Sequence, residues 1–406
     1  MKFLKKLLVW LIAIFAGIVI LAYIFDIDYL LKAVRVVYFH GKTTAYLDDY
    51  THFDNRTIEA GTPQPWAEAK GYNSVKPTKR LQHAHDELGT VAYIIIKNDS
   101  IWHEAYYDGY GPDSKSNSFS MAKSVVSAAL FKAIEEGKIK SLDTKVGDYF
   151  PEYSTGLAAE LTVGDLSSMA AGLNWDEAYS SPFSITTRAY FDSNLPETML
   201  KAGVINTPGK VFDYQSGATE LLDMVITKAI GKPLTEYVSE KFWKPMGMAN
   251  NALWQLDEKN GIEKAYCCIG SNARDFSRFG KLFLHDGNWN GTQILDTTAI
   301  QKMVTPRFAA SPQYGYGWWI NNYLGKKMYY MRGHLGQFVI VIPEDKIIIT
   351  RLGHQKGLQT ETDPHSNDFY VYVDEAYKMM GMMKPNEGKG NTLPLTKAEA
   401  ESADRQ

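Results

Sequence analysis

The pattern of apolar and polar residues changes along the chain, and each change predicts an element. Residues 91–96 and 101–106 are rich in β-branched and aromatic side chains and flank the turn residues 97–100, which predicts a β-hairpin. Residues 120–137 then carry apolar side chains at helical spacing and end at a glycine, which predicts a helix. A pair of strands therefore precedes this helix.

The middle and the end of the chain differ in the same way. Residues 140–310 alternate helical stretches with loops marked by glycine and proline, and they contain little of the alternating pattern of strands. Residues 327–331, 337–342 and 347–352 are β-rich runs that suit an antiparallel meander, and residues 367–383 predict a closing helix. We therefore predict an α+β fold, an antiparallel sheet flanked by helices with an inserted, mostly helical lobe.

The first residues differ in kind from the rest. Lys2, Lys5 and Lys6 precede an uncharged apolar run at residues 7–25. As a helix this run spans about 28 Å, close to the roughly 30 Å hydrocarbon core of a bilayer. Because it is long for a secretory signal and has no clean cleavage site, residues 1–25 are expected to form an uncleaved transmembrane anchor. The lysines place the rest of the chain outside the cytoplasm, in the periplasm of a bacterium. A cleaved signal and a secreted protein are the alternative.

Three further segments follow this anchor. Residues 26–79 mix aromatic residues with turn formers and show no sustained period, so we expect a linker that packs partly on the next segment. Residues 80–384 carry the predicted sheet and helices and form the main domain. Residues 385–406 are polar and bear glycine and proline, so we expect a disordered tail.

Composition and charge narrow the classes of function. With 45% hydrophobic and 22% charged residues, the 406-residue chain has ordinary globular composition. Its net charge of −3 gives no electrostatic footprint for nucleic acid. Cys267 and Cys268 are adjacent, and we expect small buried residues, with a vicinal redox pair as the alternative. His83 and His85 have no further ligand cluster, so we expect surface histidines and no metal site.

The predicted helix at residues 120–137 begins with a serine and a lysine three residues apart. Because such residues share a helix face, Lys123 Nζ can reach Ser120 Oγ. A neutral lysine can take the proton of a serine hydroxyl and make it a nucleophile. Bringing the lysine pKa from roughly 10.4 to 7 requires about 4.6 kcal/mol of differential desolvation or charge repulsion. The helix N-terminus also offers unpaired backbone N–H groups where an oxyanion would form.

This spacing also has an ordinary explanation. One Ser-x-x-Lys match is about what chance delivers, and an N-cap serine beside a snorkelling surface lysine would give the same pattern. Two later motifs favour the catalytic interpretation. Tyr-x-Ser stands at residues 214–216, and His-x-Gly at residues 334–336 opens the β-rich run at 337–342.

In this order and at these separations, the three motifs resemble those of the penicillin-recognising serine hydrolases. The resemblance is to the class C β-lactamase branch, which includes esterases, D-alanyl carboxypeptidases and 6-aminohexanoate-dimer hydrolases. It extends to residues 161–173 and 273–280 and covers roughly residues 85–380. It implies a β-lactamase-like fold and hydrolysis of a small ester or amide through a covalent acyl-enzyme, without a cofactor.

The resemblance also implies a role for each motif. Ser120 would be the nucleophile and Lys123 its general base, while Tyr214 would pass the proton to the leaving group and then activate water. The backbone N–H groups of Ser120 and Gln337 would form the oxyanion hole.

Three further residues, His334, Gly336 and Ser216, would line the substrate site. His334 would hydrogen-bond Tyr214 or a substrate carbonyl, or else close the polar network of its strand. The family often has lysine in place of His334 and asparagine in place of Ser216. Because neutral imidazole supplies little charge to attract a carboxylate, we expect esters or uncharged linear amides to be preferred over β-lactams.

Other functions compete with this interpretation. The chain contains no Gly-x-Ser-x-Gly elbow, no Walker loop and no His-Glu-x-x-His. One alternative is a membrane-anchored protein of the same fold that binds or senses a cell-wall fragment with little turnover. Another is a β-lactamase or D-alanyl carboxypeptidase. The aromatic residues in the run at 314–319 are expected to pack in the core rather than to form a platform for substrate. The glycines in this run indicate that its backbone closely approaches another segment.

Overall fold

The computed structural model describes residues 2–179 and 181–403, and its centre is a seven-stranded sheet. The strand order is β10-β11-β12-β13-β3-β4-β2, and all neighbours are antiparallel except β2 and β4. The strands are β2 (Ala67–Glu68), β3 (Thr90–Lys97), β4 (Ser100–Tyr106), β10 (Trp319–Tyr323), β11 (Lys326–Gly333), β12 (Gln337–Ile342) and β13 (Ile347–Gly353). The predicted hairpin and meander are both present.

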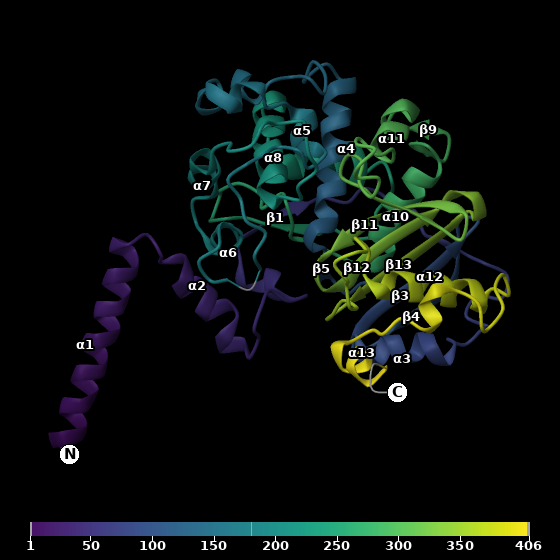
Figure 1. Cartoon of the computed structure of the whole chain (residues 1–406), viewed down its shortest axis with the longest axis horizontal. Coiled ribbons are helices and arrows are strands. Elements are labelled where there is room, and N and C mark those ends of the chain that lie inside the picture. The colour runs from purple at the N-terminus through teal and green to yellow at the C-terminus, as the bar shows by residue number, and fades with distance from the viewer. Residues whose placement is uncertain (1, 180, 404–406) are drawn as a thin grey trace.

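Helices cover both faces of this sheet (Figure 1). α3 (Lys79–Glu87) and α12 (Asn367–Met379) share one apolar cluster with the side chains of one face. α10 (Ala273–Leu284) packs on the other face, where a Cβ at Gly280 would press on Val339 at 2.9 Å. This close approach needs glycine and joins the sheet to the larger core cluster.

The helical lobe lies beside the sheet in Figure 1. It starts from a 3-10 turn, η3 (Phe119–Met121), that leads directly into the first long helix. Its helices are α4 (Ala122–Glu135), α5 (Val163–Ser167), α6 (Ile185–Phe191), α7 (Leu195–Ala202), α8 (Ser216–Ile230), α9 (Leu234–Val238), continued by a π-helical turn at Ser239–Trp243, and α11 (Thr297–Met303). The predicted helix at residues 120–137 is therefore present, although Ser120 stands in the 3-10 turn ahead of it.

The lobe is mostly helical, as predicted, and a second sheet of short strands accompanies it. Its order is β1-β6-β7-β5, formed by β1 (Asn55–Ile58), β5 (Ser116–Asn117), β6 (Ala252–Gln255) and β7 (Ile269–Ser271). A separate hairpin pairs β8 (Asn288–Trp289) with β9 (Thr292–Gln293). Strands of two to four residues are too short to show an alternating pattern, so the sequence did not reveal them.

The segment at residues 26–79 is more than a partly packed linker. β1 pairs with β6, and Leu47 and Ile58 are fully buried in the main core. Along the chain, β1 is preceded by α1 (Lys2–Ile24), α2 (Tyr29–Val36) and the 3-10 turn η1 (Tyr38–His40). Among the described residues, α1 alone is long and apolar enough to cross a membrane.

The prediction of a disordered tail does not hold for residues up to 395. Leu395 is 1% exposed and joins the cluster under α12, and Gly390 N donates to Asp374 Oδ2 at 2.7 Å. A helix, α13 (Lys397–Ala403), follows. Isolated leucines and a close-packed glycine attach this segment to the domain. The polar composition of the segment led to the prediction of disorder, because a few scattered apolar residues do not change its average. Residues 404–406 lie outside the described part.

Two smaller predictions also meet the structure. His83 is exposed as expected, but His85 is buried and shares a hydrogen bond with Thr90 Oγ1 at 3.1 Å. Cys267 and Cys268 are both buried and form a disulfide with each other.

Candidate active site

A rigid backbone turn presents Ser120. Ser118 N donates to Ile269 O at 2.8 Å, and Ser118 Oγ accepts from Ile269 N at 3.0 Å. Phe119 N donates to Asn117 Oδ1 at 2.9 Å, and Phe119 has a φ of 44°, a left-handed conformation that is costly for a bulky residue. Strain held in place by such partners is typical of functional sites, and here it precedes the candidate nucleophile directly.

Lys123 is buried beside this serine. Its Nζ lies 3.0 Å from Ser120 Oγ, 3.0 Å from Ser216 Oγ and 2.8 Å from the carbonyl oxygen of Tyr266. Burial lowers the pKa of Lys123 to about 8, although Glu177 and a second carboxylate act in the opposite direction. At pH 7.5 roughly a quarter of such lysines are neutral, compared with about one in a thousand for a free lysine. The neutral amine can accept the proton of Ser120.

Tyr214 completes the group on the side of α8. Its ring centroid lies 5.2 Å from Lys123 Nζ and 5.5 Å from the ring of Trp319. Burial and then the charge of Glu177 raise the pKa of Tyr214, while a hydrogen bond with Ser120 acts in the opposite direction. The phenol therefore keeps its proton at neutral pH and can donate it. Ser-x-x-Lys and Tyr-x-Ser, distant in sequence, meet here as expected.

Glu177 is a site residue that the sequence did not reveal. Its Oε1 accepts from Ser216 Oγ and from Tyr179 OH, each at 2.5 Å. Its Oε2 accepts from Ser216 N at 2.8 Å and from Trp175 Nε1 at 2.9 Å. One carboxylate thus ties the loop around residues 175–179 to the start of α8. Glu177 belongs to none of the three motifs. In the sequence alone, a glutamate in a polar loop cannot be distinguished from a solvated surface residue.

The same loop is fixed at a second point. Gln215 Nε2 donates to Leu173 O, and Leu173 N donates to Gln215 Oε1, both at 2.9 Å. The Trp175 ring lies directly on Gly217, where a Cβ would overlap it. These contacts hold Glu177 in place over Ser216.

His334, from the third motif, lies among aromatic rings. Its ring stacks on Tyr179 with a centroid distance of 5.1 Å and meets Phe119 edge-on at 5.6 Å. Burial, followed by the charges of Lys356 and Arg332, lowers the pKa of His334 to about 4. The imidazole is therefore neutral at pH 7. No hydrogen bond of this ring occurs within residues 2–179 and 181–403.

The rest of the third motif shapes the backbone. Gln337 Nε2 donates to His334 O at 3.0 Å and to Gly353 O at 2.7 Å, which fixes the turn between β11 and β12. Gly336 has a φ of 79°, and a Cβ there would meet Arg351 Nη1 at 2.6 Å, so its contacts are those of a packing residue.

The main chain of Gln337 lies next to the nucleophile turn. Gln337 pairs with Gly333 across β11 and β12. A Cβ at Gly333 would overlap the carbonyl oxygen of Ser118, so β11 touches the turn directly. The two backbone positions expected to form an oxyanion hole therefore belong to adjoining segments.

The aromatic run at residues 314–319 divides between core and site. Tyr314, Tyr316 and Trp318 are buried, in agreement with the predicted core role. A Cβ at Gly317 would overlap Ser127 Oγ, which confirms the close approach of backbone to α4. Trp319 is half-buried beside Tyr214.

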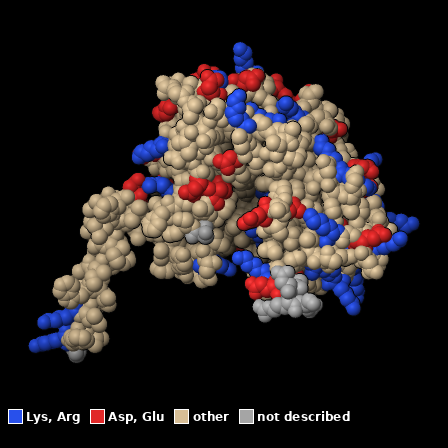
Figure 2. All heavy atoms as spheres, viewed as in Figure 1, with Lys and Arg blue, Asp and Glu red and all other residues tan. Residues whose placement is uncertain are grey.

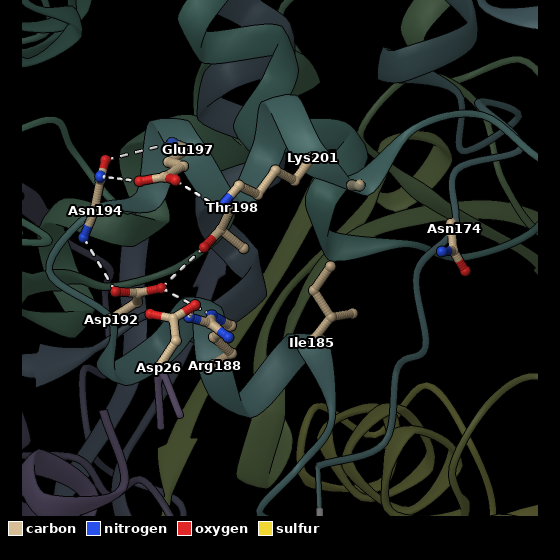
Figure 3. A pocket seen from close by; sticks show the side chains of 10 residues that line it. Asp26, Asn174, Ile185, Arg188, Asp192, Asn194, Glu197, Thr198 and Lys201 are labelled. Atoms are coloured by element: carbon tan, nitrogen blue, oxygen red, sulfur yellow. Dashed lines mark hydrogen bonds and ion pairs between the residues drawn. The ribbon is translucent and has the colours of Figure 1, made fainter. Parts of the chain in front are cut away.

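A separate pocket lies between α6, α7 and Asp26, which precedes α2 (Figure 3). Its lining residues do not belong to any of the three motifs. Arg188 pairs there with Asp26, and Arg188 Nε lies 3.1 Å from Asp192 Oδ2. These two ion pairs engage the guanidinium of Arg188.

Changing Glu177 to glutamine should move the pH dependence of the site. Loss of the negative charge removes an effect that raises the pKa of Lys123, so any activity that needs neutral Lys123 should extend to lower pH. The amide can still accept from Trp175 and Ser216 N, so the plateau rate should stay within about tenfold of wild type. A pH profile of kcat/KM with a short ester measures this.

The matched control is Asp176→Asn, the same change of charge one residue earlier on an exposed side chain. Its profile should match wild type. A Glu177→Gln profile that also matches wild type, or that moves to higher pH, would contradict the electrostatic role.

Comparison with known proteins places this geometry in context. The sequence model of the family described as Beta-lactamase matches residues 78–368. The 6-aminohexanoate-dimer hydrolase of Paenarthrobacter ureafaciens is 22% identical over 234 residues, which cover 55% of this chain and 59% of that protein. Beta-lactamase-like protein 2 of Dictyostelium discoideum is 22% identical over 251 residues, which cover 53% and 45%. The chain thus spans about half the length of these curated relatives.

Solved structures agree on the fold. A putative 6-aminohexanoate-dimer hydrolase from Bacillus anthracis matches with a TM-score of 0.70 at 22% identity, over 82% of this chain and 92% of that one. A family VIII carboxylesterase matches with a TM-score of 0.56 at 16% identity, over 75% and 98%. The predicted β-lactamase-like fold is confirmed.

Proposed function

Because the chain belongs to the beta-lactamase family, a family of hydrolases, we propose that it cleaves a small ester or amide through a covalent acyl-enzyme. The observation that carries this proposal is the 3.0 Å contact between Lys123 Nζ and Ser120 Oγ in a buried site. A nucleophile within reach of a base that is partly neutral near pH 7 meets the requirement for acyl transfer. Proteins of similar fold are named as a carboxylesterase and a D-amino acid amidase.

The proposed reaction has two halves. Ser120 Oγ attacks the acyl carbonyl while Lys123 takes its proton, and the backbone N–H groups of Ser120 and Gln337 stabilise the oxyanion. Tyr214 donates its phenol proton to the leaving group as the carbon–heteroatom bond breaks, which leaves a tyrosinate beside protonated Lys123. The tyrosinate then deprotonates a water that attacks the ester carbonyl on Ser120, and Ser120 Oγ takes its proton back from Lys123 as it leaves.

The amino-terminal helix supplies the proposed location. α1 has an apolar window with a mean hydropathy of 2.9, of which 6% is buried. We place it across a membrane, with the lysines at its start in the cytoplasm and the hydrolase domain outside. Cleavage of this segment and secretion is the alternative.

Turnover of a p-nitrophenyl ester by the full chain in detergent tests the function. Continued release of nitrophenol, together with labelling of Ser120 by a fluorophosphonate, is expected. A single stoichiometric burst would indicate a sensor that acylates once. Neither turnover nor labelling would indicate a binding protein and contradict the proposal.

The neutral His334 predicts which substrates are preferred. A β-lactam carries a carboxylate that a lysine at this position would attract, and imidazole with a pKa of about 4 supplies no such charge at pH 7.5. Arg332 lies near the site with its guanidinium 4.8 Å from the ring of Trp319, and it donates to uncharged oxygens of Pro364 and Gln359. We still expect a short ester and a linear aminohexanoate-type amide to be cleaved faster than nitrocefin.

His334→Lys should raise the ratio of nitrocefin to ester turnover at least tenfold, whereas His83→Lys, the same change on an exposed histidine, should not. Efficient nitrocefin hydrolysis by wild type would show that Arg332 alone supplies enough charge. An unchanged ratio in His334→Lys would contradict the argument from charge.

A further inference from the structure

The helix that follows α1 is docked on the rest of the protein. Only residues 25–28 separate α1 from α2. Tyr29 OH donates to Pro182 O at 3.0 Å, and Arg188 of α6 pairs with Asp26, as Figure 3 shows. A flexible tether is therefore absent from this part of the described chain. The direction in which α1 leaves the protein sets how the hydrolase domain faces a membrane.

Large apolar side chains are exposed near both ends of α2. Phe39 is 78% exposed, Tyr38 is 62% exposed, and Phe183, which follows the contact with α2, is 73% exposed. Arg35 and Lys42, close to Tyr38 and Phe39 in the sequence, are also exposed. Aromatic rings together with basic side chains in the segment that follows an apolar helix are characteristic of a surface at lipid headgroups. These five residues are called the juxtamembrane patch.

The apolar surface of α1 extends up to its junction with the main body. Figure 2 shows the projecting helix without charge between its free end and this junction, where acidic and basic side chains lie on the surface. An uncharged helix of this length, followed by exposed aromatic and basic residues, fits a bilayer better than a soluble partner.

The loop that carries part of the patch also forms a wall of the active site. Glu177 and Tyr179, which contact Ser216 and the third motif, lie on this loop. Ser184 Oγ, adjacent to Phe183, donates to Ala178 O at 2.8 Å. This bond connects the residue after Phe183 to the wall of the site.

A second connection runs through the amino-terminal segment. Asp49 Oδ1 accepts from Asn117 Nδ2 at 3.0 Å, and Leu47 O accepts from Asn117 N at 2.8 Å. Asn117 in turn accepts from Phe119 N at 2.9 Å. The segment that leaves the membrane thus holds the turn that presents the nucleophile.

We propose that the juxtamembrane patch lies in the surface of the bilayer and that the enzyme acts on amphiphiles held there, esters or amides with an apolar chain. This inference rests on the proposed hydrolase function and on retention of α1. The anchor alone keeps the enzyme at the membrane, and the patch orients it so that the wall formed by Glu177 and Tyr179 meets the lipid. An amphiphile can then reach Ser120 without leaving the bilayer surface.

Depth measurements on the full-length protein in phosphatidylcholine–phosphatidylglycerol vesicles test the orientation. An environment-sensitive NBD dye is attached to Phe39→Cys, Phe183→Cys or the control Leu157→Cys, an apolar residue of the helical lobe that is 43% exposed. The native cysteines are buried and joined to each other. We expect blue-shifted emission and quenching by nitroxide-labelled lipids at positions 39 and 183, and water-like emission at 157. Water-like emission at 39 and 183 would overturn the proposal.

Turnover in the same vesicles tests the substrate class. The double variant Phe39→Asp and Phe183→Asp should cleave a long-chain fluorogenic ester in the bilayer at least tenfold more slowly than wild type, with unchanged turnover of a short soluble ester. Equal loss on both esters, or no loss on either, would overturn the inference while leaving the hydrolase function intact. Failure of wild type on both esters would instead remove the hydrolase function, and the depth measurement would still decide the orientation.

Discussion

Replacing Ser120 by alanine is expected to lower kcat/KM for any substrate by at least about 10⁴-fold, the scale seen when a nucleophile is removed. The hydroxyl supplies the attacking atom, and the turn that presents it is held by the side chains of Ser118 and Asn117, whose hydrogen bonds the substitution leaves in place. Steady-state kinetics with a short ester measures the loss. Labelling by a fluorophosphonate should disappear with it.

Folding and specificity need separate controls for this variant. Thermal unfolding should be nearly unchanged, because the lost oxygen leaves only a small void beside Lys123. Ser114→Ala, a half-buried serine in the loop before β5, should keep wild-type activity. An alanine variant at 120 within tenfold of wild type would end the proposed mechanism.

Replacing Lys123 should be nearly as damaging, by about 10³-fold or more. Lys123→Met keeps the volume of the side chain in its buried position but removes the base. Lys123→Arg should not restore activity, because guanidinium does not give up its proton near neutral pH. Kinetics beside thermal unfolding separates loss of the base from loss of the fold, and Lys132→Met on the same helix is the matched control.

The pH profile of wild type follows from the same group. Lysine acts as a base only when neutral, so kcat/KM should rise with pH, bend near the pKa of about 8 and reach a plateau above it. The lowered pKa places this bend more than two units below that of a free lysine. An arginine variant with substantial activity, or a profile that is flat from pH 6 to 9, would show that Lys123 serves only as a spacer or fixed charge.

Much of the fold could be predicted from local sequence patterns. The hairpin of β3 and β4, the meander of β11 to β13 and the helix α4 each arise from neighbouring residues with a clear period, so they were predicted correctly. The second sheet was not predicted because its strands are short and come from three distant parts of the chain. The buried Leu395 escaped because one apolar residue in a polar tail has no periodic signal.

The residues of the candidate site also fall into two groups, those that the sequence could predict and those that only the folded structure identifies. Ser120 and Lys123 could be found from the sequence because their spacing is local, one turn of a helix. The chemistry of Lys123 could not, since its pKa depends on burial and on the charge of Glu177, 54 residues away along the chain. Glu177 became part of the site only because folding lays its loop over Ser216. Spacing along the chain determines which neighbouring groups share one turn of a helix. Desolvation and long-range contacts exist only after folding, and they decide which distant groups meet, how each group titrates and what it holds in place.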